Sequence, residues 1–159
     1  MSAPTSPHQL ARLAQIKRLN ARAKTANSPR KAHRKLDRKI SPSQRIGLKH
    51  ETRAAYYLVD QGLHILQRNV QTRVGEIDII ATDTQYLIFV EVRYRANNHY
   101  GGAIASVNRA KQSRIIRSAQ LILPTLSKNH FNGNTPYYRF DVIAMDPNHI
   151  HWITNAFGA

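Results

Sequence analysis

Two runs of alternating residues within the stretch 74–95 constrain the fold more than any other feature of this 159-residue chain. The runs, 76–81 and 86–95, are rich in β-branched and aromatic residues, and four polar residues join them. This pattern predicts a β-hairpin. When an antiparallel pair closes symmetrically about such a loop, the even residues of the first strand share a face with the odd residues of the second.

The two faces of the predicted hairpin differ in their chemistry. One face is apolar and suits burial; it carries Ile77, Ile79, Ala81, Ile88, Val90 and Val92. The other face is apolar near the turn but ends in three charged residues, Asp78, Glu91 and Arg93. Carboxylates are depleted in strands and are costly to bury without a partner. Two carboxylates this close could bind one divalent cation such as Mg²⁺, or the three residues could form a structural ion-pair ladder.

Five ordered sequence blocks resemble a known protein family. They are HETRAAYYLVDQGLHILQRN, VGEIDII, FVEVRYR, GGAIASVNRAKQSR and RFDVI. In this order they resemble the YraN family of small bacterial proteins, whose fold is restriction-endonuclease-like and close to that of Holliday-junction resolvases. The resemblance covers residues 46–159. Asp78 followed by Glu91 and Arg93 is similar to the D…(D/E)-x-K signature of such nucleases, with arginine in the place of the final lysine.

The resemblance implies an α/β (α+β) domain with a central mixed sheet of four to five strands flanked by helices. It also implies Mg²⁺- or Mn²⁺-dependent hydrolysis of phosphodiester bonds in branched or single-stranded DNA. Asp78, Glu91 and the backbone carbonyl of Val92 would hold the metal. Glu51 would orient water or a second ion, and Arg93 would complete the catalytic set. Glu51 also has a structural interpretation, as a carboxylate near the positive end of a helix.

Two residues depart from the family pattern. Arg93 is always charged, so it can bind a phosphate but cannot act as a base. Activity could then depend on Lys111 or be absent, which leaves open a non-catalytic nucleic-acid-binding protein that keeps the nuclease fold. An adaptor that binds an acidic partner is a third class. His50 stands where the family usually has a glycine before the acidic residue, and it could crowd the site or add a ligand.

The net charge of +15 favours a polyanionic partner. Residues 1–45 contain twelve of the 24 basic residues but only one of the nine acidic residues. Nucleic acid suits this region better than anionic lipid, because the region has few large apolar anchors. We interpret residues 1–42 as a basic, low-complexity and disordered arm, with a short helix at about 8–23 as its one plausible element, and residues 43–159 as the domain.

Basic residues near the hairpin are the candidate DNA-binding groups. No acidic residue occurs within 92–139, so a helix predicted over 103–123 has a basic face that favours phosphate contact over simple solvation. The candidates are Arg68, Arg73, Arg95, Lys111 and Arg114. We expect DNA more than RNA as the partner, and the resemblance to resolvases is compatible with a homodimer.

The remaining patterns complete the expected elements. They predict a helix that begins at Ser43 or Gly47 and ends near Gln61, a strand over 63–69 that pairs with the hairpin, a strand over 138–145, and a short edge strand over 150–153. Pro124 is expected to end the second helix. The chain has no cysteine and no apolar run near the ~18 residues of a membrane span. Together with the lack of an apolar signal core, this predicts a cytoplasmic protein.

Overall fold

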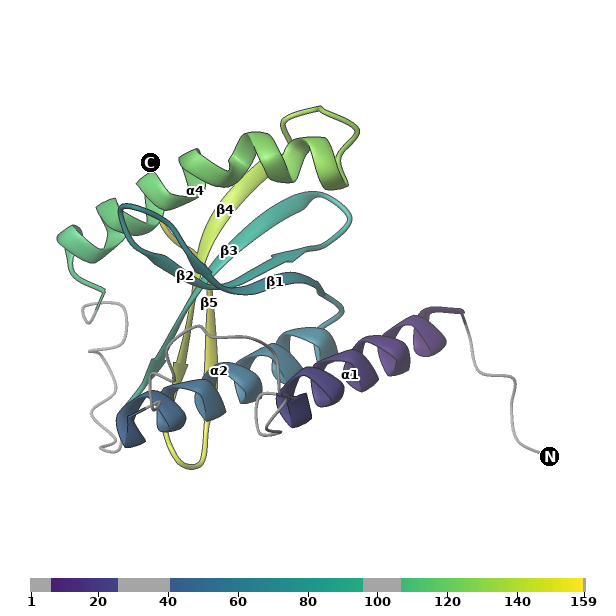
Figure 1. The fold of residues 1–159 in the computed structure, drawn as a ribbon, viewed down its shortest axis with the longest axis vertical. Helices are drawn as coiled ribbons and strands as arrows, with labels where there is room; N and C mark the ends of the chain where they lie inside the picture. Colours follow the sequence, from purple (N-terminus) through teal and green to yellow (C-terminus); the bar gives the residue numbers. More distant parts are fainter. Residues whose placement is uncertain (1–6, 26–40, 96–106, 159) are drawn as a thin grey trace, which may run out of the picture.

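A computed structural model describes residues 7–25, 41–95 and 107–158. They form a five-stranded mixed sheet with helices on both faces (Figure 1). The strands lie in the order β1 (His64–Gln71), β2 (Glu76–Thr82), β3 (Tyr86–Tyr94), β4 (Tyr137–Met145) and β5 (Ile150–Phe157). Strands β3 and β4 are parallel, and the other neighbouring strands are antiparallel. This α+β architecture is the expected one and is consistent with a restriction-endonuclease-like fold.

The predicted hairpin forms with the expected register. Ile79 pairs with Val90 and Thr82 with Leu87, so even residues of β2 lie beside odd residues of β3. The turn is stabilised by Asp83, whose Oδ1 accepts hydrogen bonds from the N–H groups of Gln85 and the following residue, each at 2.7 Å. The strand before the hairpin, β1, pairs with β2 as predicted and extends two residues further than expected.

Helix α2 (Pro42–Asp60) covers one face of the sheet and begins with a complete capping box. The side chain of Ser41 accepts from the N–H of Gln44, and the Gln44 side chain accepts from the N–H of Ser41. Pro42 takes the first helical position, where the missing N–H costs nothing. The helix therefore starts at Pro42, and not at Ser43 or Gly47. It ends before Gly62, whose φ of 93° lies in the left-handed region that glycine favours.

Helix α4 (Arg109–His130) covers the other face, and it corrects the helix predicted over 103–123. Its N-terminal cap is Asn108, whose side chain accepts from the N–H of Lys111 at 2.9 Å. The helix continues past Pro124, although a proline inside a helix costs about 3 kcal/mol. Burial of the apolar Leu126 side chain beyond the proline contributes to offsetting this cost. The predicted helical residues 103–106 and the predicted loop 96–102 lie outside the described residues.

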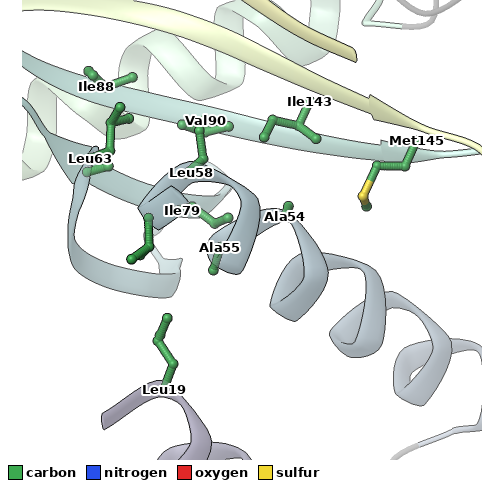
Figure 2. Close-up of a cluster of buried hydrophobic side chains, with 12 residues drawn as sticks. Leu19, Ala54, Ala55, Leu58, Leu63, Ile79, Ile88, Val90, Ile143 and Met145 are labelled. Carbon is green, nitrogen blue, oxygen red and sulfur yellow. The ribbon is translucent and has the colours of Figure 1, made fainter. Parts of the chain in front are cut away.

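Two apolar cores lie on the two faces of the sheet. The α2-side core, drawn in Figure 2, packs helix residues such as Leu58 against Ile79, Val90 and Ile143. The α4-side core contains Ile77, Ile80, Leu87, Phe89, Ile115, Leu126, Phe140 and Val142. Ile77 was expected on the same face as Ile79, but it packs in the α4-side core. The alternation of β2 is therefore broken at Asp78, which lies between them.

Helix α1 (Pro7–Thr25) belongs to the folded body, which corrects the description of this part of the chain as a disordered arm. The predicted helix over 8–23 is present and lies beside α2 (Figure 1). Leu19 is buried in the α2-side core, and Gln15 Oε1 lies 3.1 Å from His64 Nδ1. Arg12 also forms an ion pair with Asp60 at the end of α2. Two apolar residues, Leu19 and the partly buried Ile16, and these polar contacts fix the helix in a region whose composition suggested disorder.

The sheet ends in a longer edge strand than expected. Strand β5 runs to Phe157, whose ring stacks on Phe140 with centroids 5.2 Å apart. Trp152 packs against the α2-side core, and its Nε1 donates to Asp141. Among the described helices, none is long and apolar enough to cross a membrane.

Candidate active site

The carboxyl groups of Asp78 and Glu91 meet where β2 and β3 separate. Regular pairing of the two strands stops at Ile79 and Val90. One residue further along, Asp78 Oδ2 accepts a hydrogen bond from the N–H of Val92 at 2.8 Å, so a side chain replaces the strand partner. Asp78 is only 9% exposed and Glu91 only 3% exposed. The structure thus brings together the two carboxylates that the hairpin register predicted.

Burial changes the protonation of both carboxyl groups. Burial, followed by the nearby charge of Glu91, raises the pKa of Asp78 to about 7, although the Val92 N–H and Lys111 act in the opposite direction. Burial also raises the pKa of Glu91, against the lowering effects of Lys111, Arg93 and a hydrogen bond with the Asp78 side chain. At neutral pH the negative charge of either carboxylate therefore disfavours ionisation of the other. A bound proton or another cation relieves this repulsion.

Helix α4 supplies the ammonium group of this site. Lys111 Nζ lies 3.1 Å from Glu91 Oε2, whereas Arg93 Nε lies 3.4 Å from Glu91 Oε1. The Lys111 side chain is 19% exposed and that of Arg93 is 36% exposed. The sequence predicted Lys111 as a DNA-binding residue and as the lysine on which activity could depend in place of Arg93. Its contact with Glu91 adds it to the candidate catalytic residues.

Close packing at the β1–β2 turn holds α4 in this position. A Cβ atom on Gly75 would lie 3.3 Å from Arg114 Cβ and 3.3 Å from Ser118 Oγ, which is tighter than normal contact. Thr72 Oγ1 in the same turn lies 2.9 Å from Ser118 Oγ. Glycine at position 75 therefore lets the helix approach the turn and brings Lys111, one helical turn before Arg114, to Glu91.

Glu51 lies near the two carboxylates but is held by a different element. Asn69 Nδ2, on β1, donates a hydrogen bond to Glu51 Oε2. Asn69 has a φ of 53°, a left-handed conformation that asparagine tolerates. Glu51 also makes a small contribution to the raised pKa of Asp78. It occupies the middle of α2 (Pro42–Asp60), so the interpretation of Glu51 as a carboxylate in the first helical turns is wrong.

The donor set fits a divalent ion that keeps part of its water shell. Mg²⁺ is bound in proteins through one or two carboxylates and completes its octahedron with water and phosphate oxygens. Asp78 and Glu91 are two such carboxylates, and the backbone of Val92 lies beside them. Within residues 7–25, 41–95 and 107–158, no three acidic or histidine side chains converge on one point. Glu51 is thus not a member of a closed three-carboxylate cage.

The predicted DNA-binding arginines differ in their freedom to contact a ligand. Arg73, Arg95 and Arg114 are exposed. Arg73 lies in the β1–β2 turn that packs on α4, and Arg95 directly follows β3. Arg68 is half-buried instead, and its Nη2 donates to Thr52 Oγ1 of α2 at 2.9 Å. Three of the five predicted basic residues therefore remain at the surface, while Lys111 and Arg68 are engaged with other elements.

A stacked ring pair beside Glu51 and Arg93 was not predicted. The rings of His50 and Tyr94 have centroids 3.6 Å apart and planes only 13° apart. Burial, followed by the charges of Arg53 and Lys49, lowers the pKa of His50. The sequence marked His50 as a departure from the family pattern that could crowd the site or add a ligand, and it indicated no functional role for Tyr94. Their contact depends on how α2 packs on the end of β3, which no local pattern reports.

Comparison with known proteins places the chain in a family. A family model described as "Uncharacterised protein family UPF0102" matches residues 50–145. A UPF0102 protein of Bordetella petrii is 44% identical over 146 residues, which make up 90% of this chain and 87% of the relative. A UPF0102 protein of Psychromonas ingrahamii is 42% identical over 125 residues, 77% of this chain and 98% of the relative. The chain therefore belongs to family UPF0102, the YraN family that its sequence blocks resemble.

Proposed function

We propose that this protein is a metal-dependent nuclease that hydrolyses phosphodiester bonds in DNA. The main support is the contact between two buried carboxyl groups, Asp78 and Glu91, at an end of the sheet with exposed arginines. Burying two such groups together costs free energy unless a cation or proton compensates. Binding of Mg²⁺ or Mn²⁺ would compensate the two buried negative charges, because both ions prefer carboxylate oxygens.

Asp78 and Glu91 would hold the ion, with the carbonyl of Val92 as a further ligand. When bound, the ion supplies activation of water and neutralisation of charge on the phosphate. Lys111 supplies the ammonium group that contacts the phosphate. In the nuclease signature this group belongs to a lysine two residues after the glutamate, the position that Arg93 occupies in this chain. Arg93 binds a phosphate oxygen through its guanidinium and does not accept a proton.

Glu51 has a separate part in the proposal. Its carboxylate orients the attacking water, and Asn69 keeps that carboxylate in place through the hydrogen bond across to β1. Arg73, Arg95 and Arg114 then bind neighbouring phosphates of the DNA strand, since all three are exposed. The excess positive charge of the whole chain strengthens this contact at low salt.

One observation favours a second candidate, a nucleic-acid-binding protein without catalytic activity. Glu91 already has two cationic partners, Lys111 and Arg93, at 3.1 Å and 3.4 Å. These ion pairs could satisfy the glutamate without a metal, as in a structural cluster. Asp78 would then reduce the free-energy cost of its burial by binding a proton.

Isothermal titration of Mn²⁺ distinguishes the two candidates. We expect a saturable site in the wild type that is lost in Asp78→Asn, since the amide has almost the same shape but no charge. Asp60→Asn is the matched control, because Asp60 is an exposed carboxylate that pairs with Arg12 at the far end of α2. Binding that is absent from the wild type, or equal in wild type and Asp78→Asn, would leave only the nucleic-acid-binding function.

A cleavage assay then tests the reaction. We expect the wild type with Mn²⁺ to cut single-stranded or branched DNA, and Asp78→Asn and Glu91→Gln to cut about a hundredfold more slowly or not at all. Binding of the same DNA should persist in both variants, because the basic surface is unchanged. Equal cutting rates in wild type and variants would show that any activity in the preparation does not come from this site.

A further inference from the structure

We propose that the stacked rings of His50 and Tyr94 form a platform for an unpaired nucleobase, which gives the site a preference for single-stranded DNA or for unpaired ends. The inference rests on the proposed function, because it assumes that nucleic acid reaches the Asp78 and Glu91 site. It goes further by naming the form of DNA that is bound and the residues that select it.

The position of the two rings supports this role. His50 immediately precedes Glu51 on α2, and Tyr94 immediately follows Arg93 at the end of β3. The rings therefore lie where α2 meets the end of β3, and each is next in the chain to a residue of the candidate site. The ring planes are almost parallel, at 13°, and Tyr94 is 37% exposed. A large aromatic ring that remains this exposed beside a charged site is available for contact with a ligand.

The surroundings of the rings match those of a surface for single-stranded nucleic acid. Such surfaces combine cationic groups that follow the backbone with aromatic rings on which bases stack. Arg93 and Arg95 lie on either side of Tyr94 in the chain, and Lys49 and Arg53 are close enough to His50 to act on its charge. The two charges that act on the pKa of His50, those of Arg53 and Lys49, are both positive.

The alternative is that the stack only locks α2 to the end of β3. The two roles make different demands on the side chain at position 94. Packing requires apolar volume, which leucine supplies, whereas stacking of a base requires a flat ring, which phenylalanine supplies and leucine does not. In duplex DNA the bases already stack on one another, so only unpaired bases can use the platform.

The test uses the full-length chain in EDTA, with fluorescence anisotropy of a labelled oligothymidylate and of a labelled duplex of equal length. We expect Tyr94→Leu to weaken binding of the single strand by about tenfold and to change duplex binding by less than about twofold. Tyr94→Phe should bind both DNAs as the wild type does. Equal losses on both DNAs in Tyr94→Leu, or an equal loss in Tyr94→Phe, would overturn the platform.

A second measurement does not depend on a variant that folds. A series of single-stranded oligonucleotides, each with one 2-aminopurine at a different position, is titrated with the wild type. Stacking of that base on a ring should quench its fluorescence in the oligonucleotide whose 2-aminopurine reaches the platform. Quenching at no position would overturn the proposal. Since no metal is present, the result is independent of cleavage, which is measured separately with Mn²⁺. Base stacking in EDTA together with no cutting in Mn²⁺ would support the platform and count against the nuclease, and cutting in Mn²⁺ without base stacking would do the reverse.

Discussion

Two groups of buried acids in the same sheet have opposite surroundings. Asp141, on β4, is 0% exposed and accepts hydrogen bonds from Arg139 Nε at 3.1 Å, Trp152 Nε1 at 2.9 Å and the N–H of Asn155 at 2.9 Å. Asp78, on β2, receives one backbone N–H and has Glu91 as its nearest charged neighbour. The first acid is surrounded by donors, whereas the second is pressed against another acid.

The comparison separates a structural acid from a candidate functional one. Buried polar groups are normally paired, and Asp141 follows that rule with donors from three different residues. The raised pKa of Asp78 indicates that this carboxyl group lacks such compensation, whereas Glu91, whose pKa is also raised by burial, has Lys111 and Arg93 beside it. Uncompensated acids are retained where a ligand, proton or metal completes them. The ionic partner of Asp141 is Arg139, two residues earlier on the same strand.

Backbone geometry accounts for the difference. The register of β4 and β5 shifts near Asp141, and Asn155 has a φ of 50°, so its N–H turns toward the carboxylate instead of a strand partner. At the other site, β2 and β3 separate after Ile79 and Val90, so the strands no longer supply a ladder partner. One irregularity brings donors to an acid, and the other leaves two acids facing each other.

Replacing Asp141 should have the largest effect on stability. Asp141→Ala leaves three donors without their acceptor, and among the described residues Arg139 keeps Asp83 as an ionic partner. We expect the free energy of unfolding to fall by about 3–5 kcal/mol, measured by urea denaturation. Asp60→Ala, which removes an exposed ion pair, should cost less than about 1 kcal/mol. Similar losses in the two variants would contradict the distinction between the acids.

Replacing Asp78 should change the free energy of unfolding by a smaller amount, and at high pH it should increase stability. The pKa of Asp78 is raised from 3.8 to about 7, so the folded protein holds a proton that the unfolded chain releases within this interval. Its contribution to the free energy of unfolding is therefore greatest below about pH 4, falls as the pH rises to about 7 and is constant above.

Asp78→Asn lacks this titration, and its amide oxygen can still accept from Val92. We expect the variant to be more stable than the wild type at about pH 8, by up to about 3 kcal/mol in EDTA, and to lose the fall between pH 4 and 7. Urea denaturation at several pH values measures both effects. Parallel profiles for the two proteins would show that burial next to Glu91 does not destabilise the charged form of Asp78.

The two cationic partners of Glu91 should differ in their contributions to the free energy of unfolding, by less than the effects expected at Asp141 and Asp78. Lys111 is closer to the glutamate and less exposed than Arg93. Lys111→Met should therefore lower the free energy of unfolding by about 1–2 kcal/mol, and Arg93→Met by less than about 1 kcal/mol because solvent screens its charge. Double-mutant cycles with Glu91→Gln isolate each pair. A larger coupling for Arg93 would mean that the cation in the signature position, and not the one on α4, is the main partner.

Much of the fold followed from local pattern, and the exceptions have identifiable causes. The hairpin, the strand before it and β4 were predicted because alternation and turn residues act over a few residues. The end of α4 was missed because burial of Leu126 outweighs the local effect of Pro124. The packing of α1 was missed because only a few side chains, the buried Leu19 and Gln15 and the partly buried Ile16, hold it against distant residues in a basic region.

The amino-acid sequence by itself determined the hairpin register, and with it the meeting of Asp78, Glu91 and Arg93, because side chains of paired strands alternate with a period of two. The tertiary structure alone decided that Lys111 reaches Glu91, that Asn69 holds Glu51, and that His50 stacks on Tyr94. These contacts join different elements, and their relative positions depend on the packing of both cores and on the close approach of α4 at Gly75. Such packing sums many weak contacts between residues far apart in the chain, which no local pattern records.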